Sequence, residues 1–298
     1  MRRISLKGIT LLSSSIPDGI YEGVPIAGWD SSSAYAAGTL VSYTDHYVYR
    51  AKSSVASDGQ SPPSATGSWQ FAGALDRWAM FEPILRKFSQ SEGFIEVEVD
   101  VSSADVIGLF NLTGCVSVDF ELRRAGELKR KETVDLKRPG IVAGWYSWLF
   151  SGLTTESKLL WQFPKYTSAT LTLRLNGHPG ESVSCGFCSP GLLQDIAATQ
   201  RGLSASLIDY SYAPFSGGLV TITPGGSADD LSVSLMIPTV QVGSVRDIFY
   251  RGSGKPAIFD LRDSGDPDLL VVALLKKFER VYSFREWTRC VLTLNGLI

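Results

Sequence analysis

Cysteine and histidine, the side chains that bind zinc most often, are sparse in this chain. Cys185 and Cys188 are separated by two residues, the spacing of half a zinc knuckle, but no second pair follows at a suitable distance. His178 lies seven positions before Cys185, and the other histidine is His46. A cysteine pair within a strand pattern also lacks the helix N-terminus that activates a redox thiol. We therefore expect cysteines at the end of a strand here, and the sequence predicts no metal site and no cofactor.

Acidic residues form two groups that could support acid–base or cation chemistry. Glu96, Glu98 and Asp100 alternate with apolar residues, which places them together on one solvated strand face rather than across a catalytic cleft. The second group consists of Asp260, Asp263, Asp266 and Asp268. It could offer oxygen ligands to calcium, although it lacks the spacing of an EF-hand. The chain also has no Gly-x-Ser-x-Gly nucleophile elbow and no phosphate-binding loop, so we predict that it is not an enzyme.

The composition narrows the class of protein. The 298 residues suffice for about two domains of ordinary size, and a hydrophobic content of 44% suffices for cores without disulfides or metals. Only 19% of the residues are charged and the net charge is −2, which argues against a broad basic surface for nucleic acid. The best candidate for a membrane span, Leu269–Leu275, is far too short. The N-terminus has no continuous signal-peptide core, so we expect assembly in a cytoplasm with reduced cysteines.

Alternating polar and apolar residues dominate the chain and predict strands with one face on a core. The clearest cases are Phe94–Val101, Val116–Leu122, Thr170–Leu175, Leu231–Ile237 and Cys290–Leu294. Short helices are expected only at Trp78–Phe88 and Val242–Tyr250. The predicted fold class is mainly β, with two antiparallel β-sandwich domains of jelly-roll type and a small, aromatic-rich, three-stranded module.

Four segments are predicted along the chain. They are an N-terminal extension at 1–26, the small module at 27–72, a first β-sandwich domain at 73–190 and a second at 191–298, which begins after Ser189-Pro190-Gly191. The apolar residues of the extension are Ile4, Leu6, Ile9, Leu11 and Leu12. We expect these residues to dock on a neighbouring subunit, so that deleting residues 2–15 leaves the monomer folded. The alternative is a first strand that packs within its own chain.

The small module has the most regular aromatic pattern. Val41–Tyr43 and Tyr47–Ala51 predict two strands joined by a turn at 44–46. So short a segment must fill its core with bulky rings. The predicted core rings are Trp29, Tyr35, Tyr49 and Trp69.

The spacing of these rings resembles that of the small chitin- and cellulose-type carbohydrate-binding modules attached to bacterial chitinases. Those modules open and close with tryptophan and carry the pattern Tyr-x-x-Gly-x-x-Val-x-Tyr, which here is Tyr35, Gly38, Val41 and Tyr43. The place where such modules carry an exposed aromatic pair reads Lys52–Val55. The candidate glycan-binding residues are therefore Tyr43 and Tyr47, if either ring is exposed.

The run Leu75–Glu82, which reads Leu-Asp-Arg-Trp-Ala-Met-Phe-Glu, resembles a recurring segment in tail proteins of long-tailed bacteriophages. Further pieces similar to that family are Trp145–Phe150, Leu159–Tyr166, Asp209–Ser211 and a closing hairpin over 269–297. Within the run, Trp78, Met80 and Phe81 are predicted core residues. Arg77 is expected to pair with Asp76 or Glu82, or to stack on a ring.

The resemblance implies a virion structural protein of the tail tip or baseplate, which assembles in the host cytoplasm with copies of itself and with other tail proteins. Such a protein can help to position receptor-binding parts, and it inserts into no membrane and binds no nucleic acid. Two alternatives remain: a glycan-binding attachment protein that recognises host surface polysaccharide, and a polysaccharide-degrading enzyme.

Overall fold

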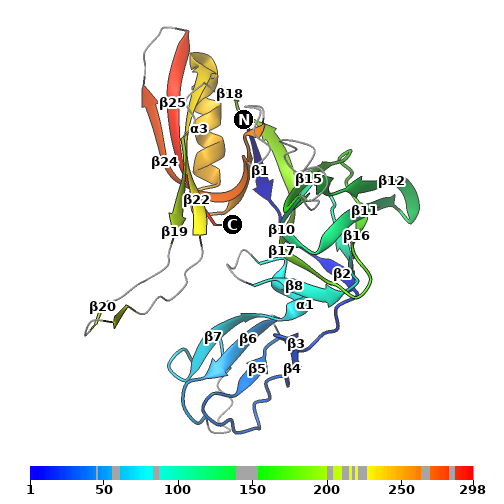
Figure 1. Ribbon diagram of the computed structural model, residues 1–298. Helices are drawn as coiled ribbons and strands as arrows, with labels where there is room; N and C mark the ends of the chain where they lie inside the picture. The colour runs from blue at the N-terminus through cyan, green and yellow to red at the C-terminus, as the bar shows by residue number, and fades with distance from the viewer. Residues whose placement is uncertain are drawn as a thin grey trace.

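The computed structural model describes residues 1–44, 46–55, 61–82, 87–138, 154–199, 204–209, 215–216, 219–220, 227–262, 269–281 and 286–297. Within these ranges the chain is mainly β, as predicted, and all pairs of named strands are antiparallel (Figure 1). No helix in this part of the chain is both long enough and apolar enough to cross a bilayer.

A five-stranded sheet has the order β12-β11-β16-β9-β2. Its strands are β2 (Leu11–Ser14), β9 (Phe94–Asp100), β11 (Cys115–Arg124), β12 (Glu127–Asp135) and β16 (Thr170–Gly177). The alternation predicted for β9 is confirmed, because its apolar residues are buried and its acidic residues lie half exposed on the opposite face.

A larger sheet has the order β15-β10-β17-β1-β23-β24-β25-β22-β18, and β8 and β19 pair with β17 and β22 off this path. Its strands are β1 (Arg2–Leu6), β8 (Ser89–Glu92), β10 (Val106–Thr113), β15 (Lys158–Gln162), β17 (Ser182–Asp195), β18 (Ala198–Thr199), β19 (Ser204–Asp209), β22 (Ser227–Pro238), β23 (Ala257–Asp260), β24 (Leu270–Val281) and β25 (Trp287–Gly296). Three short strand pairs lie outside these two sheets. They are β3 (Ile20–Tyr21) with β4 (Val24–Pro25), β13 (Lys137–Arg138) with β14 (Thr154–Thr155), and β20 (Phe215–Ser216) with β21 (Leu219–Val220).

Two main layers of buried apolar side chains pack against these sheets. In the first, Phe120 and Leu171 of the five-stranded sheet pack with Leu109 and Cys185 of β10 and β17. In the second, helix α3 (Val242–Arg251) covers β22 to β25 and buries Phe249, and Figure 1 shows it beside these strands. A 3-10 turn, η1 (Thr239–Gln241), precedes α3. The predicted helix over 242–250 is confirmed to within one residue.

Strand β1 lies between β17 and β23 and joins the two halves of the large sheet. Ile4 is opposite Leu193 on one side and Ile258 on the other, and it is 0% exposed. Ile4 therefore contacts its own chain and is not available to a neighbouring subunit. The structure shows the alternative considered above, a first strand packed within its own chain. Removal of residues 2–15 would leave β17 and β23 without this partner, so we no longer expect such a deletion to leave the monomer folded.

The predicted domain start at 191 falls inside strand β17. Pro190 has no N–H to donate, but its carbonyl accepts a hydrogen bond from the backbone N–H of Lys7 at 3.0 Å. Gly191 lies against β1, where a Cβ atom would stand 2.3 Å from Cγ2 of Ile4. The Pro-Gly pair is thus a place where two strands come close rather than a linker.

The small module is the three-stranded sheet that the sequence predicts. Its strands are β5 (Leu40–Ser42), β6 (Tyr47–Ala51) and β7 (Trp69–Ala74). Trp69 and Tyr49 are buried, whereas Trp29 and Tyr35 are half buried around them, and the rings of Tyr35 and Trp69 meet edge to face at 5.4 Å. The boundary predicted at 72 falls inside β7, so the module runs directly into the residues that follow it.

Candidate functional site

The segment Leu75–Glu82 follows β7 and begins with helix α1 (Asp76–Ala79). The predicted helix over 78–88 overlaps α1 only at 78–79, residues 80–82, 87 and 88 are not helical, and residues 83–86 lie outside the described residues. A buried serine explains where α1 ends. The hydroxyl of Ser89 donates to the carbonyl of Asp76 at 2.6 Å and accepts from the N–H of Met80 at 3.0 Å. These two backbone groups would otherwise bond to each other in a continuing α-helix. Met80 then accepts a hydrogen bond from the N–H of Cys188 in β17, so the segment is fixed to the large sheet.

The same segment also holds the loop before the module. The carboxylate of Asp76 accepts hydrogen bonds from the N–H groups of Glu22 and Gly23, at 2.8 and 2.9 Å. Arg77 lies 4.0 Å from the carboxylate of Asp18. The sequence allowed Arg77 to pair with Asp76 or Glu82 or to stack on a ring. Among the described residues its ion pair is with Asp18 instead, and the Asp76 carboxylate is engaged by backbone groups.

Trp78 connects the segment to the turn between β5 and β6. Its ring stacks on the imidazole of His46, with centroids 4.1 Å apart and planes 13° apart. Trp78 is half buried rather than a full core residue, while Met80 and Phe81 are buried as predicted. His46 has a φ of 60°, in the left-handed region, where histidine is among the non-glycine residues found most often.

A cavity of about 550 Å³ opens beside this stack. The side chains that line it include Asp18, Ser42, Tyr43, Thr44, His46 and Trp78. Aromatic residues next to hydroxyl and carboxylate groups are the residue types that line sites for ligands with both apolar faces and hydroxyls, such as a sugar. We call this cavity the aromatic cleft.

The structure separates the two predicted glycan-binding residues. Tyr43 is half exposed and lines the aromatic cleft, with its ring 5.6 Å from that of Trp29. Tyr47 does not line the cleft; its hydroxyl donates to Glu82 at 2.9 Å and its ring meets Phe71 at 5.4 Å. Sequence reasoning missed His46 as a cleft residue, although its position in a predicted turn next to two aromatic strands was a usable signal.

The predicted assembly residues after Ile4 have different surroundings. Leu6 packs partly against the core around β1, and Ile9 and Leu11 pack partly against the first apolar layer. Leu12 is 48% exposed on β2. Of the five residues, Leu12 has the side chain that is most available to a partner.

The cysteines that suggested a zinc half-site are buried free thiols. Burial raises the pKa of Cys185 to about 12 and that of Cys115 to about 11. Cys188 is also fully buried, and burial raises its thiol pKa well above the ordinary value. Thiols held in the neutral form are poor nucleophiles and poor metal ligands.

The acidic group near residue 260 contains one described member. Asp260 is buried and forms ion pairs with Arg2 at 2.7 Å and with Arg262 at 2.9 Å, so its oxygens are already engaged. Burial raises the pKa of its carboxyl, but hydrogen bonding and charge attraction from Arg262 and Arg2 lower it further, and the net pKa is below the ordinary value. The remaining members, Asp263, Asp266 and Asp268, lie outside the described residues. Across the described ranges, no group of three or more His, Cys, Asp or Glu side chains is arranged to hold a metal ion.

The other pieces that resemble tail proteins are only partly described. Leu159–Tyr166 includes part of β15, and the closing hairpin is formed by β24 and β25. Trp145–Phe150 and two residues of Asp209–Ser211 lie outside the described residues. No protein-family model matches the chain, and no curated protein matches its sequence.

Proposed function

We propose that the protein is a structural component of a bacteriophage tail tip or baseplate, in which the five-stranded sheet and the strands packed against it form a β-sandwich domain and the small module is an insert. The observation that carries this proposal is the role of Leu75–Glu82. The residues that resemble the tail-protein segment are the ones that hold the small module, the loop at 18–23 and strand β17 together. In this proposal, the segment keeps the small module in a fixed position on the rest of the subunit.

Contacts with other subunits would use exposed apolar side chains. Val240 is 90% exposed and Tyr250 is 82% exposed, and they lie at the two ends of the η1–α3 region. Large apolar side chains left in water favour a protein partner. In this proposal they and Leu12 replace Ile4 as the candidate assembly contacts, with copies of the chain and other tail proteins as partners.

Two experiments test the structural role. Antibodies raised against the purified chain should label the tail end of phage particles, as seen by electron microscopy with gold conjugates. Light scattering after size-exclusion chromatography should show a closed oligomer that Val240→Asp and Tyr250→Asp weaken. Unlabelled tails together with a monomer at all concentrations would contradict the proposal.

A second candidate function, glycan binding, is favoured by the aromatic cleft. Tyr43 and Trp78 line the cleft beside residues that carry hydroxyl groups, and a ring with a free face could stack on a sugar. A glycan array that includes host surface polysaccharides tests this idea with Tyr43→Ala and, as a matched control outside the cleft, Phe71→Ala. Binding that Tyr43→Ala abolishes and Phe71→Ala preserves would support it. An array without any bound glycan would rule it out.

A further inference from the structure

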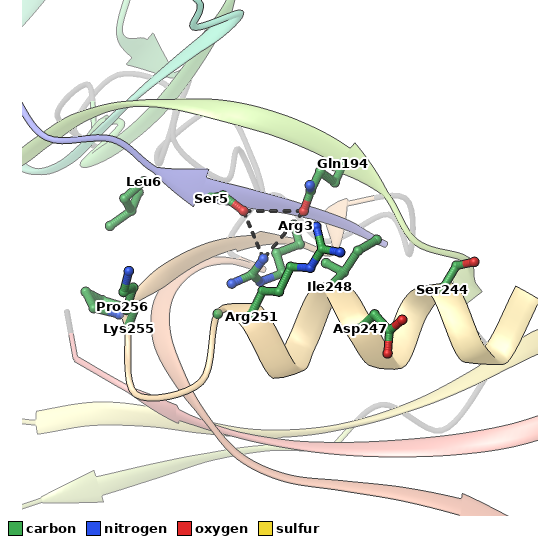
Figure 2. Close-up of a pocket in the computed structure, with 11 residues that line it drawn as sticks. Arg3, Ser5, Leu6, Gln194, Ser244, Asp247, Ile248, Arg251, Lys255 and Pro256 are labelled. Atoms are coloured by element: carbon green, nitrogen blue, oxygen red, sulfur yellow. Dashed lines mark hydrogen bonds between the residues drawn. The ribbon is translucent and has the colours of Figure 1, made fainter.

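A second cavity, of about 510 Å³, lies between strand β1 and helix α3 (Figure 2). Arg3 and Ser5 enter it from β1, Gln194 from β17 and Arg251 from α3, and Lys255 follows the helix. We call it the basic groove. It lies in the part of the molecule opposite the small module, so it is separate from the aromatic cleft (Figure 1).

Arg3 is the unusual residue of this groove. It is only 5% exposed, and within the described ranges no carboxylate pairs with it. Its Nη1 atom donates to the hydroxyl of Ser5 at 2.9 Å and to Oε1 of Gln194 at 3.4 Å, both uncharged acceptors. Burial lowers the pKa of the guanidinium. A buried cation without a counter-charge is unfavourable, and such groups are found where an anion binds.

The position of the Arg3 guanidinium is fixed by packing. Its centre lies 5.9 Å from the ring of Phe249. A Cβ atom on Gly252 would stand 2.0 Å from Nη2 of Arg3, so this glycine leaves room for the guanidinium at the end of α3. The φ of Gly252 is −95°, which any residue can adopt, and space rather than backbone conformation is therefore what glycine provides here.

The charges around the groove do not balance within the described residues. Arg3, Arg251 and Lys255 are cationic, and no ion pair joins any of them to a carboxylate in that part of the chain. Asp247 also lines the groove, but it pairs with Arg246 at 3.4 Å. The C-terminal end of α3 contributes about half a negative charge, which is too little to neutralise three cations.

We propose that the basic groove binds a phosphate group. A phosphate carries close to two negative charges and has several acceptor oxygens, which match two guanidinium groups and one ammonium group. Figure 2 shows Arg3 and Arg251 entering the groove from opposite walls, with Lys255 at one end, so that one anion can contact residues of both walls. The hydrogen bonds from Arg3 to Ser5 and Gln194 hold the buried guanidinium in place before the ligand arrives.

Isothermal titration calorimetry of the full chain tests the proposal, with chloride buffer at constant ionic strength. Inorganic phosphate is one arm and glucose 1-phosphate is the other, because free phosphate and a phosphate monoester share this chemistry. Arg251→Ala and Lys255→Ala should each weaken binding roughly tenfold, since each removes a hydrogen-bond donor that carries a charge. Lys276→Ala is the matched control: it removes an exposed cation of β24 that does not line the groove. It should leave binding unchanged.

Gly252→Ala tests the buried arginine without removing its charge. The added methyl group displaces the guanidinium of Arg3, so phosphate binding should weaken while the circular dichroism spectrum stays that of the parent chain. Equal affinity in the two arms would support free phosphate as the ligand, and tighter binding of the ester would support a phosphorylated sugar. No heat of binding in either arm would overturn the proposal. So would an equal loss of affinity in Lys276→Ala and Arg251→Ala, because binding would then be a diffuse effect of surface charge.

Discussion

Two places in this molecule join parts of the chain that are distant in sequence, and they do so by different physics. At strand β1, Ile4 is enclosed by strands on both sides and excludes water completely. At the segment Leu75–Glu82, the contact to the small module is a half-buried stack of Trp78 on His46 and a hydrogen bond to Glu82. The first joint is apolar and the second is largely polar and aromatic.

Because of this difference, β1 mainly contributes to stability, whereas the module joint leaves side chains that a ligand can contact. Burying one aliphatic side chain such as Ile4 contributes about 1.5–3 kcal/mol, whereas an aromatic pair or an intramolecular hydrogen bond contributes about 0.5–1.5 kcal/mol. Substitutions at β1 should therefore change the free energy of unfolding much more than substitutions at the module joint. The module joint keeps half-exposed rings and polar groups that a ligand can reach, and the aromatic cleft lies there.

The largest effect is expected from Ile4→Ala. Removing a fully buried side chain leaves a cavity that neighbouring strands cannot fill, so the free energy of unfolding should fall by about 3 kcal/mol. Leu12→Ala is the matched control, because Leu12 is 48% exposed and its loss should cost less than about 0.5 kcal/mol. Urea denaturation of the two variants measures both. Equal stability of the two would mean that β1 is not the enclosed joint described here.

Asp260→Asn should have the next largest effect, roughly 2 kcal/mol at neutral pH. It removes the charge that holds Arg2 and Arg262, whose side chains are partly exposed and can regain water. Because the pKa of Asp260 in the folded chain is below its ordinary value of 3.8, its carboxylate favours the folded state above that value. This contribution is lost as the pH falls through 3.8 toward the lowered pKa. Thermal melts at neutral and acid pH should thus show a gap between parent and variant that closes in acid.

Much of the strand pattern could be predicted from the sequence, because alternation records which side chains face a core. The strands at β9, β11, β16, β22 and β25 lie where the alternation placed them. Helix α3 was also predictable, because its apolar side chains recur at helical spacing and so mark the face that packs on a core. The three-stranded sheet of the module followed from its ring spacing, because so small a core needs aromatic residues.

Alternation says nothing about which strand lies next to which, and this is where sequence reasoning failed. The pattern of residues 2–6 is that of any edge strand, and only the distant partners β17 and β23 bury it on both sides. Pro190 and Gly191 are turn signals in isolation, yet the approach of Ile4 requires the glycine. Likewise, the end of α1 depends on Ser89, a residue outside the helix. The basic groove was missed because Arg3 and Arg251 meet only after β1 and α3 have packed.

Trp78→Ala tests the module joint directly. A fully buried tryptophan would cost about 3–5 kcal/mol, but Trp78 is half buried, so we expect about 1–2 kcal/mol. Differential scanning calorimetry measures the change, with Ile4→Ala in parallel for the comparison. A loss equal to that of Ile4→Ala would show that the module joint is as stabilising as β1. His46→Ala, which removes only the other ring of the stack, should cost less than Trp78→Ala.

The smallest effect is expected from Tyr47→Phe, which removes only the hydroxyl that donates to Glu82. Hydrogen bonds to charged groups are worth about 1.5–3 kcal/mol when buried, but both partners are half exposed and water can replace the hydroxyl, so the loss should stay below about 1 kcal/mol. The double variant with Trp78→Ala sharpens the comparison, because the Tyr47 hydroxyl and the His46 imidazole both approach the Glu82 carboxylate, at 2.9 and 3.8 Å, and Trp78 stacks on His46. If the joint is a set of separate weak contacts, urea denaturation should give losses that add to within about 0.5 kcal/mol. A much larger coupling would mean that the hydrogen bond to Glu82 and the stack on His46 form one cooperative unit, and the module joint would then resemble β1 in kind.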